Sequence, residues 1–501
     1  MSAISDATLG IDIGTSAVKV VAVGADGRVR ARASRPYPMA TPAPGHVEQA
    51  PEDWWRATAA AVAEVVAAVG AGAIAGIGLS GQLNGVVLMD TEDRPLGPAL
   101  IWLDTRAAAV AADLAARHGP LLREAAATEL TAIAVLSKLA WLARHAPERL
   151  GAAKRALLVK DYILWRLTGT VATDPSDASA TGLMDVRRLD WTGALCEAAG
   201  IAPALLPPIR PSLAIAGAIT SDAAAATGLA AGTPVAPGGG DVAALAVGCG
   251  VVEEGVLGVT LGTAGHVVLS ARSLPEIGRE PGFWPITHAD PARTIWLGLV
   301  MSGGLSLSWL HRTLSTGDPA RLAFPAMTAL AEGVPPGARG VSFVPFLEGS
   351  ATPAPEAAAR AGFSGLSSAH GAPEMVQAVM EGVAFNVKDC VAMFERLGGT
   401  VREVRVAEGG ARVDRWCRII ADVLERPVVR IEELDASSVG AALMAQVAVG
   451  WGGLEAVVAR TVANGTAFTP TEAHFEACRA AYRRYRRRAA TEIAFARSDA
   501  D

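Results

Sequence analysis

The sequence lacks the features that mark several specialised classes of protein. Its five cysteines show no CxxC spacing and its eight histidines show no ligand spacing. Neither a disulfide framework nor a structural zinc site is therefore expected. Charged residues make up 19% of the chain and the net charge is −6, so nothing attracts nucleic acid. No export signal and no membrane span is predicted, which favours a cytoplasmic protein.

Short apolar runs separated by turns open the chain. Residues 9–14 and 18–23 have the β-branched, alternating character of strands, and an Asp26-Gly27 step follows them. An Asp-Gly step between such runs predicts a hairpin. The chain should therefore begin with antiparallel strands, which excludes a dinucleotide-binding βαβ unit. A second strand–turn–strand unit at 255–269 repeats the pattern and suggests two related halves.

The length of 501 residues and the 51% hydrophobic content predict two globular domains in an α/β chain. We expect the boundary near residue 246, after a glycine-rich turn, which gives domains 1–246 and 247–501. Pro51 and the acidic residues that follow it predict the start of a helix, and helical patterns recur at 436–450.

Two turns combine glycine with small hydroxyl residues. The first is Asp12-Ile13-Gly14-Thr15-Ser16, and Leu261-Gly262-Thr263 repeats it. Such turns let backbone amides approach phosphate oxygens closely. A carboxylate at a strand end, as at Asp12, suits Mg²⁺, directly or through water. The alternative is a plain hairpin turn with a capping aspartate.

Gly238-Gly239-Gly240-Asp241 directs one carboxylate toward a potential ligand. A kinase that acts on an alcohol needs such a group to orient and deprotonate the hydroxyl. The alternative is a glycine-rich linker that ends in a helix cap. Farther along, Glu408-Gly409-Gly410-Ala411-Arg412 follows a strand, where exposed backbone can meet a nucleoside. Its alternative is a tight βα turn.

Polar residues in two loops form a plausible polyol pocket. Gln82, Leu83 and Asn84 belong to the first loop, and Trp102 and Asp104 belong to the second. We expect Ile101-Trp102 to be a strand. The alternative is a pair of ordinary polar loops with a structural Asp104–Arg106 pair.

These segments occur in the order of the FGGY carbohydrate kinases, which the chain resembles from end to end, most closely in their xylulokinase-like branch. Pro44-Gly45-His46-Val47-Glu48-Gln49 resembles a family segment. Lys138-Leu139-Ala140-Trp141-Leu142 matches the latter half of one signature, and 361–381 matches another. The resemblance implies two actin-like (ribonuclease H-like) ATPase domains with a central cleft, and a kinase that uses ATP and Mg²⁺.

The resemblance also implies individual roles. Asp241 would be the catalytic base, and Asp12 would lie opposite it near Mg²⁺. The other implied contacts are Gly14, Thr15, Ser16, Gly262 and Thr263 to phosphates, Gly409, Gly410 and Ala411 to adenosine, and Gln82, Leu83, Asn84, Trp102, Asp104 and Asp241 to the sugar. The implied partner is a small sugar or polyol; the oligomeric state stays open, a homodimer included.

Departures from the xylulokinase pattern fall in the sugar pocket. Where that branch reads GQMHG, GGGDN and WND, this chain has Leu83 and Asn84, Val242, and Leu103. The default substrate is D-xylulose, phosphorylated to D-xylulose 5-phosphate. The alternatives are another pentulose or polyol, such as ribulose, L-xylulose or erythritol, and an actin-like ATPase or chaperone without a sugar substrate.

Overall fold

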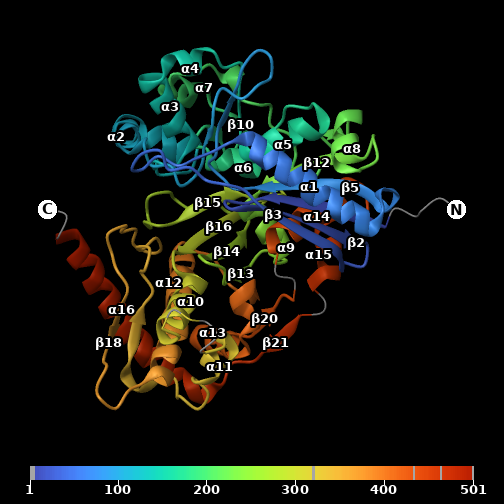
Figure 1. Cartoon of the computed structure of the whole chain (residues 1–501). Helices are drawn as coiled ribbons and strands as arrows, with labels where there is room; N and C mark the ends of the chain where they lie inside the picture. The colour runs from blue at the N-terminus through green and yellow to red at the C-terminus, as the bar shows by residue number, and fades with distance from the viewer. Residues whose placement is uncertain (1–5, 317, 319–321, 433–434, 463–464, 499–501) are drawn as a thin grey trace.

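The computed structural model describes residues 6–316, 318, 322–432, 435–462 and 465–498. Two mixed sheets with their helices lie one above the other, the first strands in blue and the second sheet in green to orange (Figure 1). Each sheet has its own hydrophobic core, with Leu9 and Ile77 in the first and Leu257 and Trp416 in the second. In the described part of the chain, no helix combines the length and apolarity that crossing a bilayer requires.

The first sheet confirms the predicted antiparallel opening. β1 pairs antiparallel with β2, and β2 with β3, while β5 and β12 run parallel to β1. Gly27, with a φ of 79°, lies in the predicted turn between β2 and β3. The strand order is β11 (Gly217–Ala218), β12 (Pro234–Gly240), β5 (Ile74–Gly81), β1 (Ala7–Ile13), β2 (Ala17–Gly24), β3 (Val29–Pro36).

The second sheet repeats this arrangement. β13 pairs antiparallel with β14, and β14 with β16, while β19 and β20 run parallel to β13. The two related halves predicted from the repeated hairpin are therefore visible in the strand directions. The strand order is β15 (Trp284–Thr287), β16 (Thr294–Val300), β14 (Gly265–Ala271), β13 (Val256–Thr260), β19 (Glu403–Ala407), β20 (Val428–Arg430), β21 (Thr466–Phe468).

Helices cover both sheets. α1 begins at Pro51, as predicted, with Glu52 and Asp53 in its first turn. In the first domain the helices are α1 (Pro51–Val69), α5 (Val159–Thr168), α6 (Pro175–Ala180) and α8 (Ser221–Thr227). In the second they are α10 (Gly303–Leu314), α11 (Phe324–Ala329), α12 (Ala372–Arg396), α13 (Asp414–Leu424), α15 (Leu454–Val462) and α16 (Phe475–Ser498).

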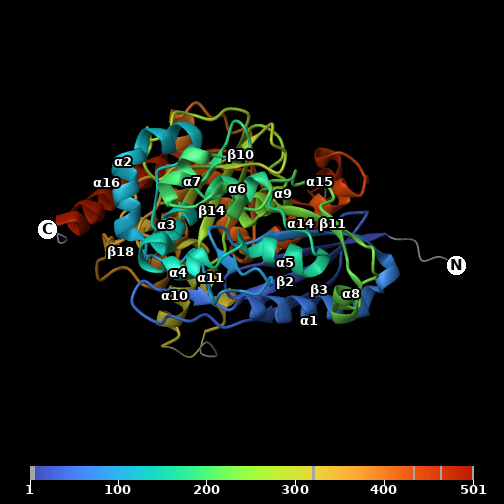
Figure 2. The same cartoon turned by 90° about the horizontal axis from the view of Figure 1, so that it is seen from above.

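A cluster of helices extends the first domain and has its own core around Leu114 and Leu139 (Figure 2). It comprises α2 (Ala108–Ala125), α3 (Val135–His145), α4 (Pro147–Gly151) and α7 (Gly193–Ala199). Short strands complete the fold: β4 (Glu48–Gln49), β6 (Val87–Met89), β7 (Ala99–Leu100), β8 (Arg155–Leu157), β9 (Met184–Asp185), β10 (Asp190–Trp191), β17 (Ser342–Val344) and β18 (Gly362–Ser364).

Two helices from distant parts of the chain, α9 (Asp241–Gly248) and α14 (Ala436–Ala448), pack backbone to backbone. A Cβ atom on Gly440 would lie 1.8 Å from the Ala244 carbonyl oxygen, so only glycine allows this approach. A Cβ atom on Gly10 of β1 would lie 1.8 Å from the Ser438 carbonyl oxygen. Although it comes late in the chain, α14 therefore packs against the first sheet. The predicted boundary near 246 falls inside α9 and stays a prediction.

Candidate active site

Hydrogen bonds from side chains hold the turn between β1 and β2 in place. The Gly14 carbonyl accepts a hydrogen bond from Gln82 Nε2 at 3.2 Å, and the Thr15 carbonyl accepts one from Gln49 Nε2 at 2.6 Å. Trp102 Nε1 donates to Thr15 Oγ1 at 2.8 Å. Among the described residues, the amides of Thr15 and Ser16 have no acceptor. Free amides on a rigid turn can bind phosphate oxygens.

Asp12 lies at the end of β1, next to this turn. Its Oδ1 accepts a hydrogen bond from Ser80 Oγ at 2.7 Å, and no described residue donates to Oδ2. Burial raises the pKa of Asp12, while Ser80 and Lys19 lower it. A carboxylate with one unused oxygen at a strand end fits a magnesium ligand. Lys19 is engaged with Asp435 at 3.2 Å.

The second predicted phosphate turn joins β13 to β14. The Gly262 carbonyl accepts a hydrogen bond from the Gly304 amide at 2.6 Å, and the Thr263 carbonyl accepts one from the Leu305 amide at 3.2 Å. The first turn of α10 thus fixes Gly262 and Thr263. The Glu408 carboxylate lies directly against this turn, because a Cβ atom on Gly262 would be 2.2 Å from Glu408 Oε2.

The predicted adenosine segment forms a 3₁₀ turn, Gly409–Arg412, after β19. The Gly410 amide donates to the Leu261 carbonyl at 3.0 Å, and a Cβ atom on Gly410 would meet Leu261 at 2.5 Å. A Cβ atom on Gly409, in contrast, would face open space. Ala411 is buried. The segment therefore lies beside the second phosphate turn, and its contact with adenosine stays a prediction.

Asp241 is the first residue of α9, directly after β12. Its Oδ1 accepts a hydrogen bond from the Val242 amide at 2.9 Å. Burial, and next the negative charge of Asp12, raise the pKa of Asp241 to about 7. Because β12, β5 and β1 are neighbouring parallel strands, their carboxyl ends bring Asp241 and Asp12 to one edge of the sheet. A carboxylate with a pKa near neutrality suits a general base.

The first of the two loops that are predicted to border the sugar follows β5. Gln82 Oε1 and Asn84 Oδ1 are buried without a hydrogen-bond partner, and Asn84 has a φ of 62°. Leu83 packs over the glycine strand, because a Cβ atom on Gly240 would lie 2.2 Å from Leu83 Cδ2. Buried acceptors without partners are costly, and contact between this loop and a sugar stays a prediction.

The second of these loops does not contain the expected strand. The strand β7 ends at Leu100, and Ile101 and Trp102 begin a turn, so that prediction was wrong. Asp104 is fully buried; its Oδ2 accepts a hydrogen bond from the Val47 amide at 2.7 Å, and Arg106 Nε donates to it at 2.9 Å. The Asp104–Arg106 pair considered as an alternative is therefore present. Contact between Asp104 and a sugar stays a prediction.

Lys138 joins the two loops that are predicted to border the sugar. Beyond its place in a family signature, no local pattern predicts this role. This lysine of α3 is fully buried. Its Nζ donates to the Asn84 carbonyl at 2.5 Å and to the Ile101 carbonyl at 2.7 Å. No described carboxylate lies within ion-pair distance, and burial lowers the pKa of Lys138 to about 7.

We expect the Lys138→Met variant to raise the KM for the sugar about tenfold and to leave the KM for ATP within about twofold. Two carbonyls lose their donor, at about 1–3 kcal/mol each, and both lie in sugar loops. Steady-state kinetics with either substrate varied would measure the split. Lys154→Met, which removes a half-exposed lysine, is the control. Equal changes in both KM values would refute this positioning role.

A buried ionic network lies beside β12, the strand that leads to Asp241. Lys160 Nζ is 2.8 Å from Asp161, 3.0 Å from Asp174 and 3.6 Å from Asp177, and all four side chains are at most 1% exposed. The network reaches the Asp241 segment through Ser176. Ser176 Oγ donates to Asp174 Oδ2 at 2.5 Å and accepts from the Gly240 amide at 3.0 Å. All four lie between positions 160 and 177, but no local pattern predicts the network, because Lys160 and Asp161 lie in the first turn of α5 and Asp174 and Asp177 lie at the start of α6.

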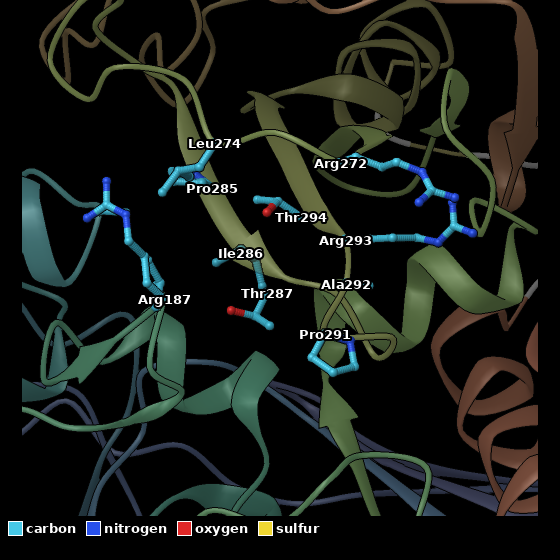
Figure 3. A pocket seen from close by; sticks show the side chains of 12 residues that line it. Arg187, Arg272, Leu274, Pro285, Ile286, Thr287, Pro291, Ala292, Arg293 and Thr294 are labelled. Carbon is cyan, nitrogen blue, oxygen red and sulfur yellow. The ribbon is translucent and has the colours of Figure 1, made fainter.

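A cavity of about 140 Å³ lies where the two domains meet, with Arg187 on one side and Arg272 and Arg293 on the other (Figure 3). Beside it, the Thr287 amide of β15 donates to Ser179 Oγ of α6 at 3.0 Å, which is a direct bond between the domains. None of the residues that line this cavity is a predicted site residue. The cavity is therefore separate from the candidate active site.

Comparison with known proteins agrees with this geometry. The chain matches the N-terminal domain of the FGGY family of carbohydrate kinases over residues 7–248 and its C-terminal domain over 257–449. It is 32% identical to a xylulose kinase of Bacillus subtilis over 92% of each chain. It is 29% identical to a gluconokinase of the same organism, over 88% of this chain and 87% of the other.

Solved structures agree as well. The crystal structure of xylulose kinase from Rhodospirillum rubrum has a TM-score of 0.89 and 31% identity, and it covers 98% of this chain and 100% of the other. The two repeated sheets are thus the two actin-like domains that the resemblance implied. On these matches and this architecture, the chain belongs to the FGGY family of carbohydrate kinases and is a sugar kinase.

Proposed function

We propose that the chain transfers the γ-phosphoryl group of ATP to a hydroxyl group of a ketopentose, with D-xylulose as the first candidate. The observation that carries this proposal is the placement of Asp241. Its carboxylate lies at the same sheet edge as Asp12 and the β1–β2 turn, and its pKa of about 7 suits a base. The acceptor hydroxyl would give its proton to Asp241 while its oxygen attacks the γ-phosphorus and ADP leaves.

Residues of both domains would bind the nucleotide. The amides of Thr15 and Ser16 from the first turn, and Gly262 and Thr263 from the second, would hold the phosphates. Gly14 shapes the first turn, and Gly409, Gly410 and Ala411 would border adenosine. Asp12, with its unused Oδ2, would hold Mg²⁺, which neutralises phosphate charge when bound.

The charges of the pocket favour a neutral ketose over a sugar acid. The acceptors Gln82 Oε1 and Asn84 Oδ1 need donors, which hydroxyl groups supply. The cations nearby are engaged, Arg106 by Asp104 and Lys138 by two carbonyls. A carboxylate such as that of gluconate would find no unpaired partner there and would face Asp241.

A specific observation also supports a second candidate, another pentulose or a polyol. Where the xylulokinase pattern has a histidine, this chain has Asn84, and Val242 replaces an asparagine after the base. Asn84 is shorter than the histidine, and Val242 has no hydrogen-bonding group in its side chain. Such changes can shift the preference among substrates that differ in one hydroxyl. This candidate keeps the base and the phosphate turns and changes only the acceptor.

Coupled ADP release with Mg·ATP would test the proposal against D-xylulose, D-ribulose, L-xylulose, erythritol, glycerol and D-gluconate. We expect the highest kcat/KM with D-xylulose and at least about tenfold less with gluconate, because the acid has no cationic partner. Preference for another neutral member would move the substrate to the second candidate. ATP hydrolysis indifferent to every sugar would favour an ATPase and contradict the proposal.

A further inference from the structure

Glu408 has a backbone conformation that side chains rarely adopt. Its φ of 68° and ψ of −169° lie in a region populated almost entirely by glycine. It follows β19 and precedes Gly409 and Gly410, so glycine would fit the turn without this cost. The chain keeps an acidic residue there, next to the second phosphate turn.

Within the described ranges, the Glu408 carboxylate has no hydrogen-bonding partner of its own. It touches Gly262, and it makes no hydrogen bond or ion pair with any described residue. The charge of Lys19 acts on it, but Lys19 is 3.2 Å from Asp435 and its charge is largely committed there. Asp12 adds a second negative charge to the same region. Phosphate groups bound at the two turns would therefore meet uncompensated negative charge.

We infer that Glu408 determines the cation dependence of nucleotide binding, by disfavouring the metal-free nucleotide and admitting its magnesium complex. The inference rests on the proposed role of Gly262 and Thr263 as phosphate contacts. Metal-free ADP carries about three negative charges to a carboxylate that Lys19, paired with Asp435, offsets only in part, and a divalent ion lowers that repulsion. Glu408 is then a residue that determines specificity for the magnesium complex of the nucleotide over the metal-free nucleotide.

Two variants separate the charge from the backbone strain. Glu408→Gln removes the charge and keeps the side-chain length and the strained backbone, while Glu408→Gly removes both. Glu476→Gln is the control, because Glu476 is a 78% exposed residue of α16. Thermal melts of all variants verify folding. Isothermal titration with ADP, in excess EDTA and in excess MgCl₂, gives the two dissociation constants. A pH of about 8.5 keeps the carboxylate ionised, because burial raises its pKa to about 7.

We expect Glu408→Gln and Glu408→Gly to bind metal-free ADP about 3- to 10-fold more tightly than the wild type, the effect of removing one partly screened charge. Affinity for Mg·ADP should change less, so the ratio of the two constants falls. The control should leave that ratio unchanged. An unchanged ratio in Glu408→Gln would overturn the inference, and a change in Glu408→Gly alone would assign the effect to strain instead. Absence of Mg·ADP binding by the wild type would overturn the proposed function itself.

Discussion

The Asp241→Asn variant is expected to bind nucleotide as the wild type does and to turn over at least about 10²-fold more slowly, the usual scale for loss of a general base. The amide keeps the size of the side chain and can still accept from the Val242 amide. It cannot take the hydroxyl proton. Coupled ADP release and nucleotide titration would measure the two effects separately.

The pH profile gives this prediction a second, independent readout. Asp241 acts as a base only when deprotonated, and burial and Asp12 raise its pKa to about 7. The kcat/KM of the wild type should therefore fall about tenfold per unit below pH 7 and level off above it. In the Asp241→Asn variant, kcat/KM should not show this fall below pH 7. Asp222→Asn, an exposed position in the first turn of α8, is the control. Wild-type turnover in Asp241→Asn would remove Asp241 from the catalytic role.

The Lys160→Met variant should have the largest effect on stability, a loss of about 3–5 kcal/mol in the free energy of unfolding. Lys160 is the only described cation within 4 Å of any of the three buried carboxylates, Asp161, Asp174 and Asp177. Burial lowers the pKa of Lys160, but those carboxylates outweigh burial and raise it above its ordinary value, which favours the charged lysine. Without it, buried negative charge remains unpaired.

Calorimetry would measure this loss, preferably as separate transitions because two domains need not unfold together. Lys154→Met tests the same chemical change at a side chain that is 42% exposed. It should leave the temperatures of the unfolding transitions unchanged. Adding Asp177→Asn to Lys160→Met should recover part of the loss, because it replaces one of the three carboxyl groups left without Lys160 by a neutral amide. A single variant as stable as the wild type would contradict the importance of the network.

Local patterns were enough to predict much of the fold. Alternating apolar residues and Asp26-Gly27 identified the antiparallel opening, and Pro51 with its acidic neighbours identified the start of α1, because these signals act within a few residues. The strand expected at Ile101-Trp102 was wrong because β7 has only two residues, Ala99–Leu100, and its end depends on pairing with β4. Strands that short leave almost no periodicity.

The site was predictable only in part, for a related reason. Asp12, Asp241 and the glycine turns stand out because their residue types are needed for phosphoryl chemistry. Lys138 and Lys160 have no such local signal. The acceptors of Lys138 lie 37 and 54 positions away, and two of the three carboxylates around Lys160 lie at the start of α6. The orientation of Glu408 depends on backbone angles that no residue pattern specifies.

Because α14 packs on the first sheet, the first domain includes a helix that the ribosome synthesises late. On the ribosome, β1 and β5 emerge early, but the helix that meets Gly10 and Gly78 ends only at Ala448. At about 5–20 residues per second, roughly 10–40 s separate the emergence of α9 from that of α14. During that interval one face of the nascent first domain is uncovered, so its folding cannot be completed in the order of synthesis.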